Sequence, residues 1–107
     1  QVKGQHVPKG TNYCFQIQID KYEPVFRKYD IIAISEEEAS HNEIGMFCFK
    51  GICYIRTLYR KDGVCRLRAL NVMEPDIEVE KEEELRCLGK VLGKIYGECK
   101  ILDLDKE

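Results

Sequence analysis

Short stretches in which apolar and polar residues alternate run through most of this chain. An alternation of period two is typical of half-buried β-strands, because successive side chains point to opposite faces of a sheet. Many short strands separated by turn signals predict an all-β domain, built as a barrel or a sandwich. The pattern predicts strands over residues 13–19, 30–35, 45–50, 52–59, 64–70, 77–79 and 85–96.

The first predicted strand has one apolar face. Tyr13, Phe15, Ile17 and Ile19 share this face, and polar residues alternate with most of them. We expect the apolar face to be the buried one. Pro24 ends the pairing of this strand and sets a turn, because proline has no N–H to donate to a neighbouring strand.

Two tight hairpin turns are predicted further along the chain. Lys50-Gly51 separates two apolar alternating segments, and Asp62-Gly63 separates the next two. The Asp-Gly dipeptide is the stronger signal, because it supports the positive φ angles that a two-residue turn requires.

Residues 85–96 have an ambiguous pattern that also fits a helix. Gly89 and Gly93 lie inside this segment, and each disfavours a helix by about 1 kcal/mol. We therefore expect a strand in which the two glycines lie at a bend or a bulge.

The remaining segments are predicted to be irregular. Residues 1–12 contain glycine and proline among polar residues and are interpreted as a linker or extended arm, which leaves 13–107 as the domain. The polar segment 35–43 is expected to be an exposed loop with room for a helical turn. Residues 71–76 are expected to form a second loop. The weakly alternating end, 100–107, fits either a short pairing strand or a frayed tail.

Composition and charge narrow the class of protein. The length of 107 residues fits one domain, and 44% hydrophobic with 34% charged residues is typical of a soluble globular protein. No apolar run is long enough to span a membrane, and no signal peptide is visible, so we expect a cytoplasmic protein. The net charge of -2 argues against direct nucleic-acid binding. Because the chain begins with Gln1, we expect it to be part of a longer or processed protein.

The chain has six cysteines, and three interpretations of them are possible. Cys14, Cys48, Cys53 and Cys65 lie in apolar alternating segments, where a thiol packs as a small hydrophobic side chain. Buried free thiols are therefore the main expectation, and disulfides are an alternative. There is no Cys-x-x-Cys, and neither histidine has metal-ligand spacing from a cysteine, so no metal and no cofactor are expected.

Residues 15–34, FQIQIDKYEPVFRKYDIIAI, resemble the active-site segment of the LexA and phage-repressor family of self-cleaving serine peptidases. That segment typically contains Gly-Asp-Ser-Met-Glu-Pro after an apolar strand, followed by a spacer, Gly-Asp and a second apolar strand. The acidic and proline positions of the motif are kept, and Asp30 opens the second strand. Ile19 stands in place of the glycine, Lys21 in place of the nucleophilic serine, and Tyr22 in place of the methionine. The residues that match the motif are Asp20, Glu23 and Pro24.

The resemblance extends over roughly residues 13–96. Residues 55–58, Ile-Arg-Thr-Leu, stand where the family has Val-Lys-Arg-Leu, so Arg56 replaces the lysine that is the general base. Residues 89–95 are similar to the closing Gly-x-Val-x-Gly-x-Ile strand of the family. The order and spacing of these motifs imply the barrel-like β fold shared by LexA and signal peptidases.

The replacements imply that the chemistry is lost. The family mechanism pairs a serine with a neutral lysine that accepts its proton. The ammonium of Lys21 is not a nucleophile unless its pKa is strongly depressed, and the guanidinium of Arg56 cannot serve as a base. Ser35 and Ser40 are the only serines of the chain, and both lie in the acidic loop. The resemblance thus implies a pseudo-peptidase without catalytic residues, whose degenerate active-site positions are Asp20, Lys21, Tyr22, Glu23, Pro24 and Arg56.

Two cations at the former dyad positions would repel each other if they approached closely. One interpretation is that Lys21 and Arg56 are solvated and point apart. The alternative is a vestigial cleft that binds an anion or a carboxylate-bearing peptide.

The resemblance implies a regulatory and dimerising role. Family members commonly carry an N-terminal helix-turn-helix domain, so this chain is expected to be the C-terminal part of a bacterial LexA-like or prophage-repressor-type regulator that forms a homodimer. DNA would then be bound only through a domain upstream of Gln1. Alternatives are a β-domain that binds a peptide or protein partner, and a peptidase that uses other residues. The candidate dimer-interface residues are Leu85, Leu88, Val91, Ile101, Leu102 and Leu104.

Overall fold

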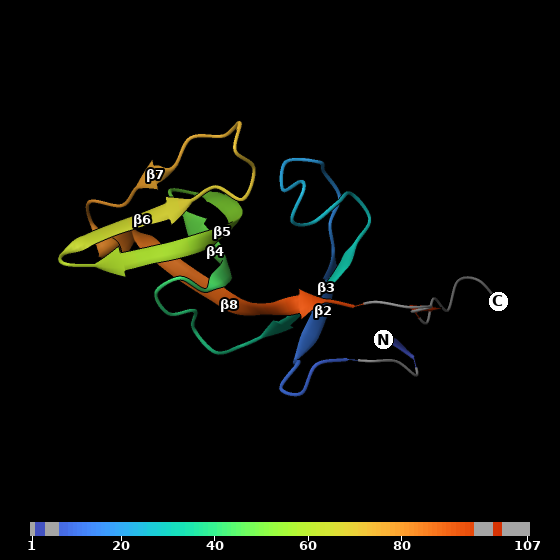
Figure 1. The fold of residues 1–107 in the computed structure, drawn as a ribbon. Helices are drawn as coiled ribbons and strands as arrows, with labels where there is room; N and C mark the ends of the chain where they lie inside the picture. The colour runs from blue at the N-terminus through green and yellow to red at the C-terminus, as the bar shows by residue number, and fades with distance from the viewer. Residues whose placement is uncertain (1, 4–6, 96–99, 102–107) are drawn as a thin grey trace.

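The computed structural model describes residues 2–3, 7–95 and 100–101, and within them the chain folds into antiparallel β-sheet (Figure 1). The main sheet has seven strands in the order β2-β3-β8-β4-β5-β6-β7. The only regular helix among the described residues is a single 3-10 turn, Glu82–Glu84, and no described helix has the length and apolar character needed to cross a membrane. The all-β prediction is therefore confirmed. The main-sheet strands are Tyr13–Gln16 (β2), Ile31–Ser35 (β3), Ile44–Phe49 (β4), Ile52–Lys61 (β5), Val64–Arg68 (β6), Ile77–Glu78 (β7) and Leu85–Lys94 (β8).

A second, two-stranded sheet pairs the two ends of the chain. It consists of β1, Val2–Lys3, and β9, Lys100–Ile101, which run antiparallel. The start of the chain thus contributes a strand within the segment that was predicted to be an arm. The part of the predicted tail beyond residue 101 lies outside the described residues.

Strand β8 connects the two halves of the main sheet. Its first half pairs with β4 up to Lys90, and its second half pairs with β3 from Lys90 onward, so that Lys90 has partners on both sides. In Figure 1 this strand runs from the lobe of β4–β7 to the lobe of β2 and β3. The register shifts twice, leaving Leu88 and Leu92 without opposite residues. Each bulge residue is followed by a glycine, as the sequence predicted.

Both predicted hairpin turns are present. Lys50 and Gly51 have φ angles of 52° and 82°, and Asp62 and Gly63 have φ angles of 55° and 79°. Positive φ at both central residues defines the turn type whose twist matches that of the flanking strands. These turns set the registers of β4 with β5 and of β5 with β6.

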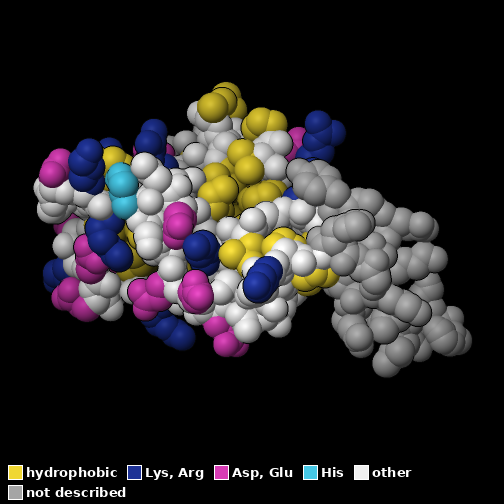
Figure 2. All heavy atoms as spheres, turned by 60° about the horizontal axis from the view of Figure 1, so that its bottom comes forward, with side chains coloured by type: hydrophobic (Ala, Val, Ile, Leu, Met, Phe, Trp, Pro, Cys, Tyr) yellow, Lys and Arg dark blue, Asp and Glu magenta, His cyan; other side chains and the backbone are white. Residues whose placement is uncertain are grey.

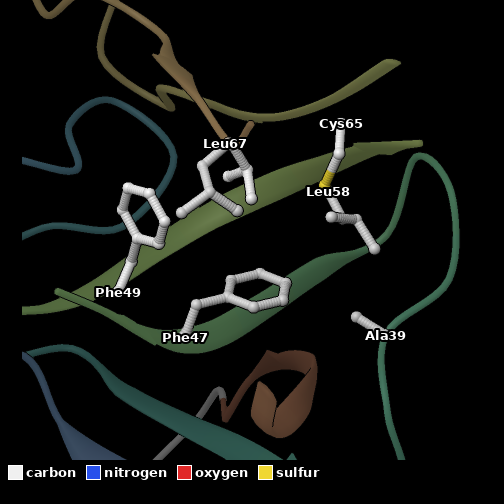
Figure 3. Close-up of a cluster of buried hydrophobic side chains, with 7 residues drawn as sticks. Ala39, Phe47, Phe49, Leu58, Cys65 and Leu67 are labelled. Atoms are coloured by element: carbon white, nitrogen blue, oxygen red, sulfur yellow. The ribbon is translucent and has the colours of Figure 1, made fainter. Parts of the chain in front are cut away.

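Apolar side chains form two clusters, which we call the first core and the second core. Because successive side chains of a strand point to opposite faces, Phe47 of β4 and Leu58 of β5 lie in the first core, and Ile55 of β5 lies in the second core. Figure 3 shows the labelled first-core side chains converging from β4, β5, β6 and the loop that holds Ala39. The first core contains Ala39, Phe47, Phe49, Leu58, Cys65, Leu67 and Val79. The second core contains Ile17, Phe26, Ile32, Ile34, Ile55 and Val91.

The first strand differs from its prediction. Strand β2 ends at Gln16, and although Ile17 is fully buried, Tyr13 and Phe15 are 38% and 40% exposed. These two residues lie on an edge strand that pairs only with β3 in the main sheet, so less of their surface is covered. The alternation correctly predicted a strand here, but the face that it predicted to be buried is only partly buried. Strands β6 and β7 also end earlier than predicted, at Arg68 and Glu78.

The segment predicted as the exposed loop 35–43 is partly buried. Ser35 belongs to β3 and is 4% exposed, and Ala39 is 4% exposed within the first core. The Ala39 N–H donates to the Cys87 Sγ at 3.4 Å, which ties the loop to β8. Glu43 closes the loop, because its carboxylate accepts the Ser40 N–H at 2.8 Å and lies 3.3 Å from the Lys90 Nζ. The Ser40 N–H and the Lys90 ammonium together hold the pKa of Glu43 below its usual value.

The cysteines differ in their surroundings. Cys65 is buried in the first core, and burial raises the pKa of its thiol. Cys48 and Cys87 are half-buried free thiols. Cys53 is a free thiol but is exposed, which corrects the expectation that it packs as a buried side chain. Within the part of the chain that is described, no group of three or more His, Cys, Asp or Glu side chains is placed to hold a metal.

We predict that Gly89→Ala destabilises the fold by about 1–3 kcal/mol, the usual range for overpacking. A Cβ at this position would lie 2.6 Å from both the Ile34 Cγ2 and the Ser35 carbonyl oxygen, so β8 and β3 would have to separate. Urea denaturation measures the change in the free energy of unfolding. Gly51→Asn is the matched control, because a Cβ there meets no atom within 4 Å and asparagine tolerates positive φ. Equal losses in both variants would contradict the close approach.

Candidate functional site

A cavity of about 290 Å³ lies where the motif residues meet. Its walls come from the loop after β2, from the first half of β5, and from the loop between β6 and β7. These two loops stand on the same side of the sheet in Figure 1. Lys21 and Arg56, which are far apart in the sequence, both line this cavity. The structure therefore brings together the two positions that the resemblance assigned to the dyad.

The first half of β5 forms a wall because β6 covers only the second half. Strand β6 pairs with β5 from Thr57 to Lys61, whereas β4 pairs along residues 52–57. Within the described residues, the side of β5 that faces away from β4 is thus open to the cavity over residues 53–56. An unpaired strand edge offers backbone N–H and C=O groups to other polar groups.

Arg56 is buried and hydrogen-bonded. The residue is only 9% exposed. Its Nη1 donates to the Pro75 carbonyl at 2.7 Å and to the Leu67 carbonyl at 3.4 Å. Its guanidinium carbon also lies 5.2 Å from the centre of the Tyr54 ring. The interpretation that this side chain is solvated is therefore wrong. Arg56 connects β5 to β6 and to the loop that follows it.

Lys21 lies in a different environment from Arg56. It is exposed and belongs to the turn 21–25, in which the Glu23-Pro24 peptide bond is cis. The retained motif residues, Asp20, Glu23 and Pro24, are exposed as well. Lys21 is thus at the solvent-facing side of the cavity, and Arg56 is in its wall.

Asp30 anchors the far end of this loop. Its Oδ2 accepts the Arg27 N–H at 2.7 Å and lies 3.4 Å from the Lys94 Nζ on β8. Backbone bonds from Ile17 N–H to the Asp30 carbonyl and from Tyr29 N–H to the Ile17 carbonyl close the base of the loop. The loop that carries Lys21 is therefore fixed to the sheet at both of its ends.

Tyr22 is the residue whose role was not foreseen. It was interpreted only as the replacement of a methionine, but its half-buried ring packs against the second core and lines the cavity. Burial raises the pKa of its phenol, while a hydrogen bond from the Ile55 backbone and the nearby Arg56 charge act in the opposite direction. The phenol is therefore a neutral group at physiological pH. The aromatic, largely apolar side chain of Tyr22 was the one sequence signal that could have indicated this packing.

Neither serine lies in the wall of this cavity. Ser35 is buried in β3, and its Oγ accepts the Glu37 N–H at 3.1 Å. Ser40 is exposed, and its N–H donates to Glu43. The two hydroxyl groups are thus placed away from both Lys21 and Arg56.

The candidate interface residues are divided between core and surface. Val91 is 8% exposed within the second core, so its side chain is not available to a partner. Leu85 packs against the first core, and Leu88 is half-buried at a bulge. Ile101 lies in β9, while Leu102 and Leu104 lie outside the described residues.

The surface carries mixed charge. Figure 2 shows basic and acidic side chains interspersed over the face in view, with apolar groups gathered between them. Several of the exposed charges are paired, as in the 3.0 Å contacts of Arg60 with Glu82 and of Arg66 with Glu78. Ion pairs near the surface add about 0–1 kcal/mol each, so these pairs contribute little to stability.

We predict that Arg56→Met lowers the free energy of unfolding by about 1.5–3 kcal/mol, the usual contribution of hydrogen bonds to a charged group. The substitution keeps much of the apolar stem but leaves the Leu67 and Pro75 carbonyls without their donor. Urea denaturation provides the measurement. Arg86→Met is the matched control, since Arg86 is an exposed arginine of β8. If both variants unfold at the same urea concentration, Arg56 does not hold the loop.

Comparison with known proteins gives a family match over most of the chain. A family model described as peptidase S24-like matches residues 2–92, which is most of the chain and includes both Lys21 and Arg56. No curated protein shows a significant match. The matched region contains the whole main sheet except the last two residues of β8. The chain therefore belongs to the peptidase S24-like family, the family of LexA and phage-repressor C-terminal domains.

Proposed function

We propose that this chain is a non-catalytic dimerisation and regulatory domain of a LexA-like or prophage-repressor-type transcriptional regulator. One observation carries the proposal: Lys21 and Arg56, at the two positions that the resemblance assigns to the dyad, line the same cavity. The family fold supports the regulatory part, since S24 domains of this type typically dimerise.

The residues in the cavity do not supply the family chemistry. A lysine amine becomes a nucleophile when burial or neighbouring cations keep it neutral, and Lys21 is exposed to solvent. A guanidinium is always protonated in proteins, so Arg56 has no lone pair with which to accept a proton. Its donors are also engaged by two carbonyl groups. Asp20, Glu23 and Pro24 would then be remnants of the motif without a catalytic role.

Dimerisation would give such a domain its regulatory effect. Linking two DNA-reading domains makes the second binding event intramolecular, which raises the affinity for two half-sites. In this proposal a helix-turn-helix domain upstream of Gln1 reads the operator, and this domain holds two copies together. Control of the regulator would then act on dimerisation or on a partner, because self-cleavage is no longer available.

We predict that a longer protein containing this chain shows no self-cleavage at neutral or alkaline pH, as measured by mass spectrometry after prolonged incubation. The double variant Lys21→Ser/Arg56→Lys is the comparison, since it restores both residue types of the dyad. Fragments from the unaltered protein that disappear in Lys21→Ala would overturn the non-catalytic assignment. Cleavage that persists in Lys21→Ala would point to a contaminating protease.

We also predict that Leu102→Glu/Leu104→Glu weakens self-association by roughly 10-fold or more, because burying one leucine in an interface generally contributes about 1.5–3 kcal/mol. Sedimentation equilibrium gives the dimer dissociation constant. The matched control is Val72→Glu/Met73→Glu, which adds the same charges at two residues that are 89% and 83% exposed. An unchanged constant in the tail variant excludes the tail. Loss of self-association in the control alone would place the interface at the loop after β6.

A partner-binding β-domain is the second candidate function. The cavity supports it, because exposed Ile19 and Ile52 stand beside Lys21 at the cavity, and the edge of β5 is open there. An extended peptide could pair with such an edge and place apolar or acidic side chains in the cavity. The coding sequence upstream of Gln1 separates the two functions: a helix-turn-helix favours the regulator, and a different domain favours the partner-binding module.

A further inference from the structure

Two thiols face each other across the hairpin of β4 and β5. Cys48 and Cys53 are direct partners in the register of these strands, and both are free thiols. Partner residues of an antiparallel pair project to the same face of the sheet. The two sulfur atoms therefore belong to side chains that lie next to each other although neither was expected to form a site.

The hairpin turn determines the kind of pair that they form. Phe49 and Ile52 flank the two-residue turn and are the hydrogen-bonded partners that close it. Hydrogen-bonded and non-hydrogen-bonded pairs alternate along an antiparallel ladder, so the next pair, Cys48 with Cys53, is of the non-hydrogen-bonded kind. In such a pair the Cα atoms are about 4.5 Å apart, which lies within the range of about 4.4–6.8 Å found in disulfides.

The pair lies on a different face from Cys65 and Cys87. Cys65 is buried in the first core, and the Cys87 thiol is engaged with Ala39 and Gly89 next to that core. Cys48 and Cys53 lie on the opposite face of the β4–β5 ladder, together with Ile55 of the second core. Of the two, Cys53 is exposed and lines the cavity, whereas Cys48 is half-buried.

We propose that Cys48 and Cys53 form a dithiol modification site that low-molecular-weight disulfides, such as that of glutathione, oxidise reversibly to an intramolecular disulfide. The exposed Cys53 thiolate attacks one sulfur of the small disulfide, forming a mixed disulfide and releasing one small thiol. The Cys48 thiolate then attacks the Cys53 sulfur and releases the second small thiol. In total the protein loses two protons and two electrons, and the small disulfide gains them.

The location gives this modification a structural effect. The bridge would cross β4 and β5 next to the turn 50–51, where the partner Cα atoms are already close, so the ladder need not rearrange. It would also remove the Cys53 thiol from the wall of the cavity that holds Lys21 and Arg56. An exposed bridge is the labile, regulatory kind rather than the structural kind. The inference rests on the hairpin register and is independent of the proposed regulatory function.

Oxidised glutathione and peptide mapping test the proposal directly on the folded, reduced chain. Trypsin cleaves after Lys28, Lys50 and Arg56, so Cys48 and Cys53 fall in separate peptides, 29–50 and 51–56, each with a single cysteine. We expect the chain to lose two titratable thiols without retaining glutathione. We also expect peptides 29–50 and 51–56 to become linked, and dithiothreitol to separate them again.

Single variants test the order of the steps. Cys48→Ser should stop at the mixed disulfide, with glutathione retained on Cys53, and Cys53→Ser should form no link between the two peptides. Cys87→Ser is the matched control, since it removes a half-buried cysteine of the other face and should leave the link unchanged. A stable glutathione adduct on Cys53 of the unaltered chain, a link to another cysteine, or a link that forms only in urea would each overturn the proposal.

Discussion

The fold depends on one strand that pairs on both sides with different partners. β8 holds β4 along its first half and β3 along its second, and without it the lobe of β4–β7 would have no strand in common with β2 and β3. The strand carries two bulges, each followed by a glycine, and a bulge bends a strand and increases its local twist. Gly89 also allows β3 to approach closely. The cavity depends on the same strand, since Lys21 belongs to one lobe and Arg56 to the other.

Arg56, at the position that the resemblance assigns to the general base, is part of the architecture of this fold. In this chain Arg56 donates to two carbonyl groups from separate segments, and it lies over the ring of Tyr54. The planar guanidinium has several donors in a fixed arrangement, whereas an ammonium is a compact, strongly hydrated charge. A lysine in this wall would have to stay neutral to act as a base, and a neutral amine would hold the loop less well. Arg56 thus contributes to stability at the position where the resemblance places the general base of the family.

Local signals predicted the elements of this fold, and long-range contacts decided the rest. The dipeptides Lys50-Gly51 and Asp62-Gly63 specify their turns through backbone conformation alone, so the hairpins were predictable. The order of the family motifs predicted that Lys21 and Arg56 lie at one site. The motifs contain no information on the two carbonyl groups that accept hydrogen bonds from the guanidinium. The exposure of Phe15 follows from the edge position of β2, and the burial of Ala39 follows from a loop that folds back onto β8. The alternation of apolar and polar residues predicts neither the exposure of Phe15 nor the burial of Ala39, because it does not show which segment covers a given side chain.

The shape of the cavity is maintained by the packing of the fold itself, without a ligand. Much of its wall consists of groups that the fold needs for its own stability, such as Tyr22 and Ile55 against the second core and Arg56 between β5 and the loop after β6. Most of the residues that shape the cavity, such as Tyr22 and Ile55, lie outside the two positions that the resemblance assigns to the dyad, so the wall does not depend on those two positions alone. Its rim is different: Ile19 and Ile52 are 45% and 54% exposed and gain nothing from remaining apolar in the isolated domain. Exposed apolar groups of this kind are typical of binding surfaces, so the rim, rather than the buried wall, is the part of the cavity suited to a partner.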